Sequence, residues 1–133
     1  AADPRLIDSA VEELLRFESP LQLNNRLTTG PMVINGTEIP AGTFLTLGVG
    51  AANRDPAQFD RPDELDIGRT PNNHVAFGQG QHACSGMNVA RLEGRIAFGR
   101  LVARFPGIDL AAVPERDPRI RFRGFRRLPV TLG

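Results

Sequence analysis

The chain has 133 residues, of which 41% are hydrophobic and 23% charged, with a formal net charge of +1 at pH 7. This composition indicates one folded domain, excludes a disordered chain and argues against a dedicated nucleic-acid surface. The sequence has no apolar run of membrane-spanning length, no secretory signal and a single cysteine, so we expect a cytoplasmic protein that binds neither membrane nor nucleic acid.

A helix is expected over residues 1–20, where Asp3-Pro4 offers an N-cap followed by a proline. Apolar residues recur at helical spacing until Ser19-Pro20 ends the pattern. Residues 21–50 hold short apolar runs separated by turn signals, which predicts a small antiparallel sheet with a hairpin at Asn35-Gly36.

A long loop is expected over residues 51–76, because this stretch is mostly polar and has no sustained period. Residues 87–105 have a helical pattern with two apolar sectors, so we expect a long buried helix packed on two sides. The sectors are Val89, Leu92 and Ile96, and Ala97, Leu101 and Phe105. In the expected β region, 106–133, Ile120 and Phe122 alternate with arginines as in a strand with one exposed face; a phosphate-binding ribbon is the alternative. The expected fold class is α+β.

Residues 77–86, FGQGQHACSG, place the only cysteine, Cys84, between a glycine-rich loop and the start of the second helix. Gly78 and Gly80 permit a tight loop, and Gly86 lets a flat or bulky group approach the first helical turn. Unpaired backbone N–H groups at a helix start stabilise a thiolate sulfur. These are the needs of a cysteine that ligates a metal.

The residues of this segment are also compatible with four different roles. An inert buried cysteine is the plainest one. A zinc site would draw on His74, His82 and Cys84, and a Cys–His nucleophile would pair Cys84 with His82. The stretch 78–83 also matches the dinucleotide fingerprint G-x-G-x-x-A after a strand-like HVAF, with Asp109 as the acidic partner.

FGQGQHACSG resembles the haem-ligand signature F-G-x-G-x-[HR]-x-C-x-G of the cytochrome P-450 family, the haem-thiolate monooxygenases, at every specified position. Further stretches resemble segments of bacterial members in the same order: VEELLRFESP, AANRDP, PDELDIGR, NVARLEGRIAFGRLVARFPGIDL and RGFRRLPV. The resemblance covers essentially the whole chain. It implies one truncated haem-binding domain, the C-terminal part of that fold: E-x-x-R helix, small antiparallel β-sheet, long meander loop, Cys-ligand loop, long buried helix and C-terminal β-hairpin.

The resemblance implies haem b as the cofactor and Cys84 as the axial thiolate ligand of its iron, where strong electron donation favours cleavage of the O–O bond. Arg26 and His82 match positions that bind the haem propionates, with a surface arginine and a loop-ordering histidine as the plain alternatives. The remaining positions that match haem-contacting residues of the ligand loop are Phe77, Gly78, Gly80 and Gly86.

Glu13 and Arg16 lie three residues apart and so share one helix face. A surface ion pair is the plain interpretation, whereas the resemblance implies a buried structural pair that ties the helix to the long loop. Many members complete this network with an arginine or histidine where this chain has Glu64. Arg61 or Arg69 is the candidate replacement.

The resemblance also implies a ferredoxin-type electron donor on the proximal face, near Arg91, Arg95 and Arg100, and substrate contacts from Leu23 and Phe122. Members of the family are much longer, and the distal helix that delivers protons to bound oxygen has no counterpart here. We therefore expect the proximal half of a monooxygenase site, without monooxygenase activity by itself, covered by a missing N-terminal segment or a second copy. A stand-alone dimeric haem-binding module and a haem-free interaction module are the alternatives.

Overall fold

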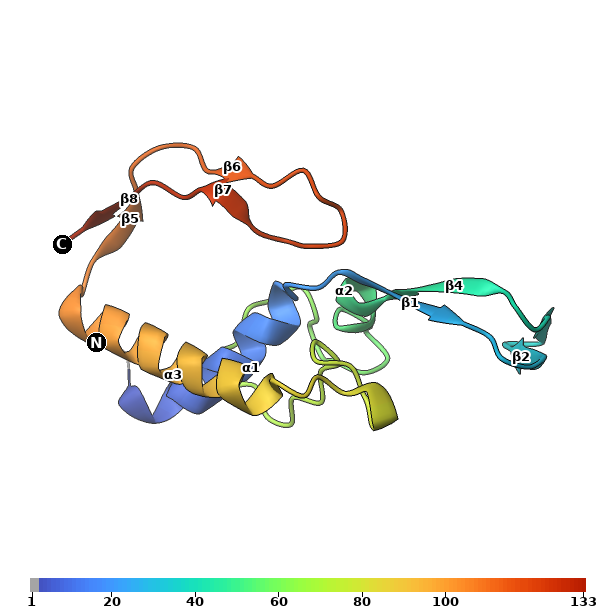
Figure 1. The fold of residues 1–133 in the computed structure, drawn as a ribbon. Helices are drawn as coiled ribbons and strands as arrows, with labels where there is room; N and C mark the ends of the chain where they lie inside the picture. Colours follow the sequence, from blue (N-terminus) through green and yellow to red (C-terminus); the bar gives the residue numbers. More distant parts are fainter. Residues whose placement is uncertain (1–2) are drawn as a thin grey trace.

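In the computed structural model, which describes residues 3–133, two helices and a long loop form a body from which two β arms extend (Figure 1). The described strands pair in two-stranded antiparallel sheets in the orders β1-β4, β2-β3, β5-β8 and β6-β7, in agreement with the expected α+β class. The helical elements are η1 (Pro4–Leu6), α1 (Ile7–Phe17), α2 (Val49–Ala52), η2 (Gly80–His82) and α3 (Met87–Arg104). The strands are β1 (Leu23–Leu27), β2 (Met32–Ile34), β3 (Thr37–Ile39), β4 (Phe44–Gly48), β5 (Ile108–Leu110), β6 (Glu115–Arg116), β7 (Phe125–Arg127) and β8 (Val130–Leu132).

Helix α1 follows the short turn η1, which is capped by Asp3: the Asp3 carboxylate accepts from the backbone N–H of Arg5 at 3.0 Å. The apolar side of α1 faces the rest of the body, and its Val11 is only 3% exposed. The helix expected over 1–20 thus forms between Pro4 and Phe17, while residues 1–2 lie outside the described range.

The first β arm is a narrow ribbon that ends in the predicted hairpin. β1 and β4 pair from Leu23 opposite Gly48 to Leu27 opposite Phe44. Asn35 and Gly36 join β2 to β3 with φ angles of 49° and 79°, the left-handed conformation that two-residue hairpin turns require. The short helix α2, directly after β4, is not expected from the sequence because four residues are too few to show a helical period.

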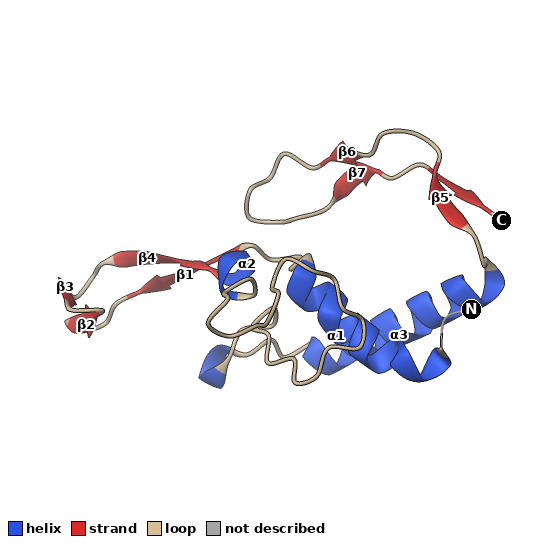
Figure 2. Ribbon diagram, turned by 180° about the vertical axis from the view of Figure 1, so that it is seen from behind, coloured by secondary structure: helices blue, strands red, loops and turns tan. Residues whose placement is uncertain are grey.

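The loop between α2 and α3 winds along α1 (Figure 2). Within residues 3–133 the one helical turn of this loop is η2 and the loop contains no strand, so the strand-like HVAF stretch does not form the strand that the dinucleotide fingerprint requires. Its anchors are Asn53 and Phe59, whose exposed fractions are 0% and 6%. The predicted meander is therefore an ordered loop held by buried side chains.

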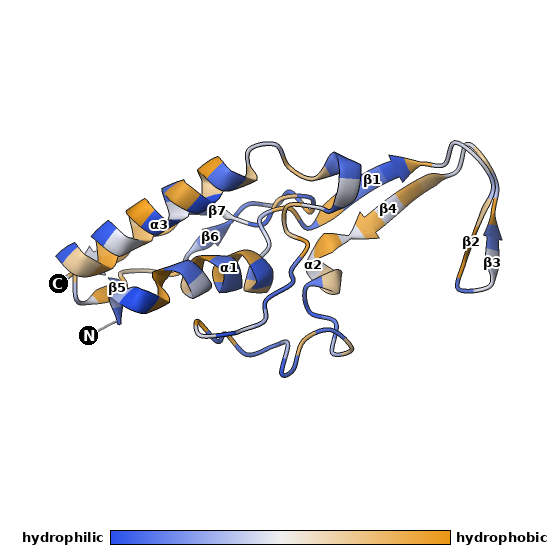
Figure 3. Cartoon of the chain, turned by 90° about the horizontal axis from the view of Figure 1, so that it is seen from below, coloured by the Kyte–Doolittle hydropathy of each residue, from blue (hydrophilic) through white to orange (hydrophobic). Residues whose placement is uncertain are grey.

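Helix α3 packs against α1 through a face of small residues instead of its apolar sectors. A Cβ on Gly94 would lie 3.1 Å from Val11 Cγ1, and one on Gly99 would lie 3.9 Å from Ile7 Cγ1, so glycine permits the close approach. Members of both predicted sectors stay at the surface: Val89, Leu92, Ile96 and Leu101 are 59%, 53%, 48% and 39% exposed. The expected burial of this helix on two sides is wrong here, because α1 covers only the glycine face. Apolar residues remain along α3 (Figure 3), which marks a surface for contact with further protein.

The C-terminal arm is a long hairpin built from two short ladders (Figure 1). Residues 117–124 form the loop between β6 and β7, closed by the N–H of Asp117 donating to the carbonyl of Gly124 at 3.1 Å. The expected strand around Ile120 and Phe122 is wrong; Phe122 makes only an isolated bridge. Two of the neighbouring arginines bind separate acids instead of lining one sheet face: Arg119 binds Asp117 at 2.9 Å, and Arg123 binds Glu18.

The most deeply buried side chains are polar. The largest that are fully buried are Arg16, Glu13, Asn53 and Ser19, while the buried apolar residues are Val11, Val49, Phe59 and Ala76. Because buried polar groups are costly unless they are paired, this part of the fold depends on hydrogen bonding as much as on apolar contact. Among residues 3–133, no helix has the length and apolar character needed to cross a membrane.

Candidate functional site

The loop before α3 presents the sulfur of Cys84 at the surface. The backbone N–H of Cys84 donates to the carbonyl of Phe77 at 2.8 Å, which closes the loop. Gly78 and Gly80 both have a φ of 71°, where a side chain would be strained. The cysteine is exposed, which corrects its interpretation as an inert buried residue.

Space around the sulfur is kept open by the glycine at the start of α3. Gly86 is the N-cap of the helix, and a Cβ built on it would lie 3.9 Å from Cys84 Sγ. At Gly78 a Cβ would lie 3.5 Å from the carbonyl oxygen of His82, within the same loop. The loop therefore brings these residues together around an accessible sulfur.

The alternative chemical roles of the segment fail on geometry. Within residues 3–133 no three His, Cys, Asp or Glu side chains are grouped to hold a metal ion, so the zinc site of His74, His82 and Cys84 is not formed. No hydrogen bond in the described chain joins Cys84 to His82 as a nucleophile and its base would require. Asp109 lies in β5, antiparallel to β8, instead of ending a parallel strand as a dinucleotide fold needs.

Glu12 of α1 binds residues on both sides of this loop. Its carboxylate accepts from Arg91 Nε at 2.7 Å and from Arg91 Nη2 at 2.9 Å, and its Oε2 lies 3.0 Å from His74 Nε2. Phe77 lies between these partners: the Arg91 guanidinium is 5.0 Å from its ring centroid and the His74 ring 6.3 Å. Neither the Glu12 contact nor this cluster is evident from the sequence, because the residues are far apart in the chain.

The hydrogen bonds of His74 define its tautomer. Its Nδ1 accepts from the backbone N–H of Ala76 at 3.2 Å, so Nε2 carries the proton and donates to Glu12. Burial lowers the pKa of His74 below 6.5, although the Glu12 carboxylate acts in the opposite direction. The hydrogen bond from Arg91 lowers the pKa of Glu12. The pair is therefore a neutral imidazole donating to a carboxylate.

Glu13 and Arg16 form a fully buried ion pair, with both side chains 0% exposed. Arg16 Nε and Nη2 donate to the two carboxylate oxygens at 2.8 and 2.7 Å. The other nitrogen, Nη1, donates to the backbone carbonyls of Asn53 and Pro62 at 2.9 and 2.8 Å. This arginine therefore ties α1 to the long loop.

Arg69 is the third charged partner of this network. Its Nε lies 3.2 and 3.1 Å from the two oxygens of Glu13, and its side chain is 9% exposed. Arg61 instead pairs with Glu64 at 2.8 Å on the surface. Glu64 contributes only its backbone carbonyl, which accepts from Arg16 at 3.1 Å. Of the two candidates, Arg69 completes the network.

Burial alone would raise the pKa of Glu13, but the hydrogen bonds from Arg16, the backbone N–H of Asp66 and Arg69 outweigh it and hold this pKa at about 2. Asn72 Nδ2 also donates to the carboxylate, at 3.1 Å. The group is thus a permanent anion at neutral pH.

Asn53 is a site residue that sequence reasoning missed. Its side chain is fully buried, donates from Nδ2 to Ser19 Oγ at 2.7 Å and accepts at Oδ1 from the backbone N–H of Val75 at 2.8 Å. It joins the end of α1 to the chain just before the cysteine loop. The only sequence signal was its place in the AANRDP segment.

Arg26 lies in β1 opposite Leu45, and its Nη1 donates to the carbonyl of Asn25 at 2.8 Å. His82 is the last residue of η2 and is exposed. Between residues 3 and 133 no ion pair engages either side chain, and no hydrogen bond links them to each other. Both therefore have cationic or donor groups available to an anionic ligand.

The two stretches predicted to contact substrate lie side by side. Leu21 and Phe122 form an antiparallel bridge, and the N–H of Gln22 donates to the carbonyl of Arg121 at 2.8 Å. Leu23 follows in β1 and is half-buried.

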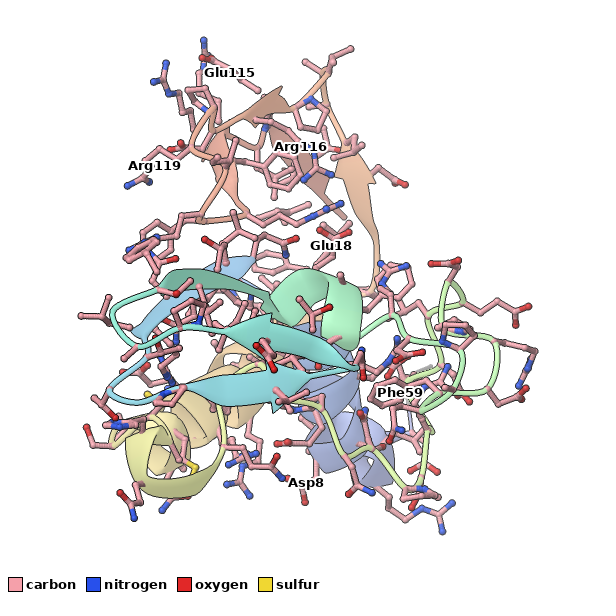
Figure 4. The ribbon with its side chains drawn as sticks, turned by 90° about the vertical axis from the view of Figure 1, so that its right-hand side faces the viewer. Asp8, Glu18, Phe59, Glu115, Arg116 and Arg119 are labelled. Carbon is pink, nitrogen blue, oxygen red and sulfur yellow. The ribbon has the colours of Figure 1, made fainter. Side chains whose placement is uncertain are left out.

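Glu18 fixes the C-terminal arm to the end of α1 (Figure 4). Its Oε1 accepts from Arg123 Nη2 at 3.1 Å, and Arg116 Nη1 lies 3.9 Å from its Oε2. This acid therefore holds the Phe122 region against the body.

The predicted arginine surface on α3 is only partly present. Arg91 turns toward α1 and pairs with Glu12, and its side chain is 28% exposed. Arg95 lies 3.2 Å from Asp8 and is 44% exposed, and Arg100 is exposed. Arg91 and Arg95 both pair with acids of α1, and of these two Arg95 remains the more exposed.

Comparison with known proteins gives consistent results. Residues 3–129 match the Cytochrome P450 family. The polyketide biosynthesis cytochrome P450 PksS of Bacillus subtilis is 44% identical over 98% of this chain and 33% of that protein. The vitamin D(3) 25-hydroxylase of Pseudonocardia autotrophica is 47% identical over 100% of this chain and 34% of that protein.

Solved structures agree. The chain superimposes with a TM-score of 0.95 and 45% identity on P450BioI in complex with an acyl carrier protein ligated with hexadec-9Z-enoic acid, covering 98% of this chain and 34% of that one. It superimposes with a TM-score of 0.93 and 42% identity on Bacillus subtilis PksS, with the same coverage. The chain spans about a third of the length of the relatives it matches.

Proposed function

Since the chain belongs to the cytochrome P450 family, we propose that Cys84 ligates the iron of haem b and that the chain forms the proximal, haem-holding part of a haem-thiolate monooxygenase. Members of this family bind haem b. The observation that carries the proposal is the placement of the sulfur, exposed at the start of α3 on a glycine loop whose two ends are held by α1.

The residues present fit this cofactor. Cys84 supplies a soft sulfur ligand, and Gly86 leaves the space beside it free of a side chain. Arg26 and His82 carry groups suited to charge-assisted hydrogen bonds with propionates. When bound, the haem supplies the oxygen and one-electron chemistry of the family, with the thiolate as electron-donating ligand.

The chain's own residues hold and orient the ligand. The bond from the Cys84 N–H to the Phe77 carbonyl fixes the loop, so the sulfur does not have to be ordered when the metal binds. By the family resemblance, the Phe77 ring would limit access of water to the sulfur once the cofactor is bound.

The family takes electrons from ferredoxin-type proteins, and for this chain we propose that such a donor contacts the exposed Arg95 and Arg100. Substrate contacts are proposed from Leu23 and Phe122, on the basis of the bridge that joins their segments. A cytoplasmic location accords with these soluble partners.

The test is an absorption spectrum of the purified chain, as isolated or after addition of haem, and then reduced under carbon monoxide. We expect the red-shifted Soret band of a thiolate–carbonyl complex in the wild type. Cys84→Ala should lose this band, whereas the matched control Ser85→Ala, at the exposed neighbouring position, should keep it.

No haem band after reconstitution would overturn the proposal and favour a haem-free interaction module. Retention of the thiolate-type band in Cys84→Ala would remove the ligand assignment. Size-exclusion chromatography of the haem-loaded chain separates a monomer from the alternative in which a second copy covers the open haem face.

A further inference from the structure

Glu12 links the two flanks of the cysteine loop through one carboxylate. His74 precedes the loop and Arg91 follows it, and both bind Glu12, at 3.0 Å for His74 and at 2.7 and 2.9 Å for Arg91. A carboxylate that holds both flanks restricts how far the loop can open, because either flank moves only by breaking a charge-assisted hydrogen bond.

The contacts continue from Glu12 to the ligand itself. The Arg91 guanidinium packs over the ring of Phe77 at 5.0 Å, and the His74 ring lies 6.3 Å away on a tilted plane. The carbonyl of Phe77 accepts the backbone N–H of Cys84 at 2.8 Å. Loss of the Glu12 contacts would therefore free the Phe77 ring. The backbone carbonyl of Phe77, which accepts the hydrogen bond from Cys84, would then be held less firmly.

The side chains of Glu12, His74 and Arg91 are partly or fully buried, which strengthens the hydrogen bonds between them. The side chains of Glu12 and Arg91 are 27% and 28% exposed, and that of His74 is 2% exposed. Two-pronged, partly buried pairs of this kind are stronger and more specific than surface pairs.

A second ion pair on the same helices provides the contrast. Asp8 and Arg95 join α1 to α3 at 3.2 Å, but their side chains are 71% and 44% exposed. Figure 4 shows Asp8 at the edge of the body. Within the described chain the hydrogen bonds of Asp8 include none to His74 or Phe77. This pair stabilises the helix contact without reaching the cysteine loop.

We propose that Glu12 is a positioning residue for the Cys84 ligand loop, acting through His74, Arg91 and Phe77 to keep the sulfur in the geometry of a thiolate ligand. The part that concerns the ligand rests on the proposed haem function. The part that concerns the loop stands on the contacts of the chain itself.

The test compares Glu12→Gln with Asp8→Asn, which removes the same kind of charge from the same helix. Amide hydrogen exchange is measured at Cys84, and the reduced carbon monoxide spectrum is recorded after haem addition. We expect the exchange rate of the Cys84 amide to rise about tenfold in Glu12→Gln and to stay within about twofold in Asp8→Asn. In the spectrum, Glu12→Gln should transfer part of the thiolate-type band to the shorter-wavelength band of a neutral thiol.

Equal exchange rates and equal spectra in the two variants would overturn the proposal. If the wild type takes up no haem, the proposed function fails, while the amide exchange still decides whether Glu12 holds the loop. Should Glu12→Gln not fold, Arg91→Lys serves instead: it keeps the charge but loses the two-pronged bond and the packing on Phe77, and it should show the same changes.

Discussion

Replacing Glu13 by glutamine should destabilise the chain more than almost any other single exchange of similar shape. Its carboxylate receives hydrogen bonds from Arg16, Arg69, Asn72 and the backbone N–H of Asp66. Glutamine would keep the volume but would turn an NH₂ group toward these donors and leave two guanidinium groups without a counter-charge.

The structure gives two routes to the magnitude. Removal of one partner from a buried ion pair costs about 3–5 kcal/mol, and both side chains of this pair are fully buried. Independently, a shift of the Glu13 pKa from 4.5 to about 2 corresponds to about 3 kcal/mol of stability. The two energies agree, so we expect Glu13→Gln to lower the unfolding free energy by about 3 kcal/mol or more at pH 7.

The second route also predicts a pH dependence. Because the folded-state pKa of Glu13 lies below its ordinary value, its contribution is fully present above pH 4.5 and is lost as the pH falls toward 2. The difference in unfolding free energy between the wild type and Glu13→Gln should therefore shrink over that interval.

Urea unfolding followed by far-UV circular dichroism, at several pH values, measures both effects. The matched control is Glu64→Gln, since the Glu64 carboxylate pairs with Arg61 on the surface and both side chains are about 60% exposed; it should change stability by no more than about 0.5 kcal/mol. A cost for Glu13→Gln below about 1 kcal/mol, or a difference independent of pH, would refute the reasoning.

Three further outcomes are expected. Gly99→Ala should raise the unfolding free energy by about 0.5–1 kcal/mol, because alanine has the higher helix propensity. Gly94→Ala should raise it less or lower it, because the new methyl group would lie 3.1 Å from Val11. Urea unfolding measures both variants. Gly36→Val should cost at least about 1 kcal/mol in the same assay, because the φ of 79° is strained for a branched side chain. NMR titration should give His74 a midpoint below 6.5, so its contribution to stability is complete above that pH and declines as the pH falls through the lowered pKa.

Each of these has its own control. Equal stabilisation by the two helix exchanges would show that Gly94 does not face a close neighbour. Gly30, which has open space around it and no positive φ, is the control for Gly36, and Gly30→Val should change stability by no more than about 0.5 kcal/mol. A midpoint for His74 at or above 6.5 would contradict the expected effect of burial.

Features with strong local signals could be predicted from the sequence. The hairpin at Asn35-Gly36 follows from two residues that accept left-handed conformations, and the extent of α3 follows from its helical period up to Pro106. The face through which α3 packs could not be predicted, because apolar periodicity does not reveal that Gly94 would admit Val11.

The candidate site likewise contains residues that could be predicted from the sequence and residues that could not. The FGQGQHACSG segment identified the family, and the spacing of Glu13 and Arg16 placed them on one helix face. The remaining partners, such as Asn53 and Asn72, come from a loop without a period, where pairing depends on the folded path of the chain. The strand-like HVAF stretch before the cysteine forms no strand, because it lies in the long loop and pairs with no neighbouring strand in the described chain.

The buried polar centre has a kinetic consequence. Its hydrogen bonds join residues far apart in sequence, 37 positions for Arg16 and Asn53 and 59 for Glu13 and Asn72. Contacts of such separation form only after the intervening chain has closed, so we expect them to arise late in folding, and we expect α1 and the hairpin to form early. Substitutions at Asn53 should therefore accelerate unfolding while leaving the folding rate nearly unchanged. The buried network then governs the lifetime of the folded state and not the speed at which it assembles.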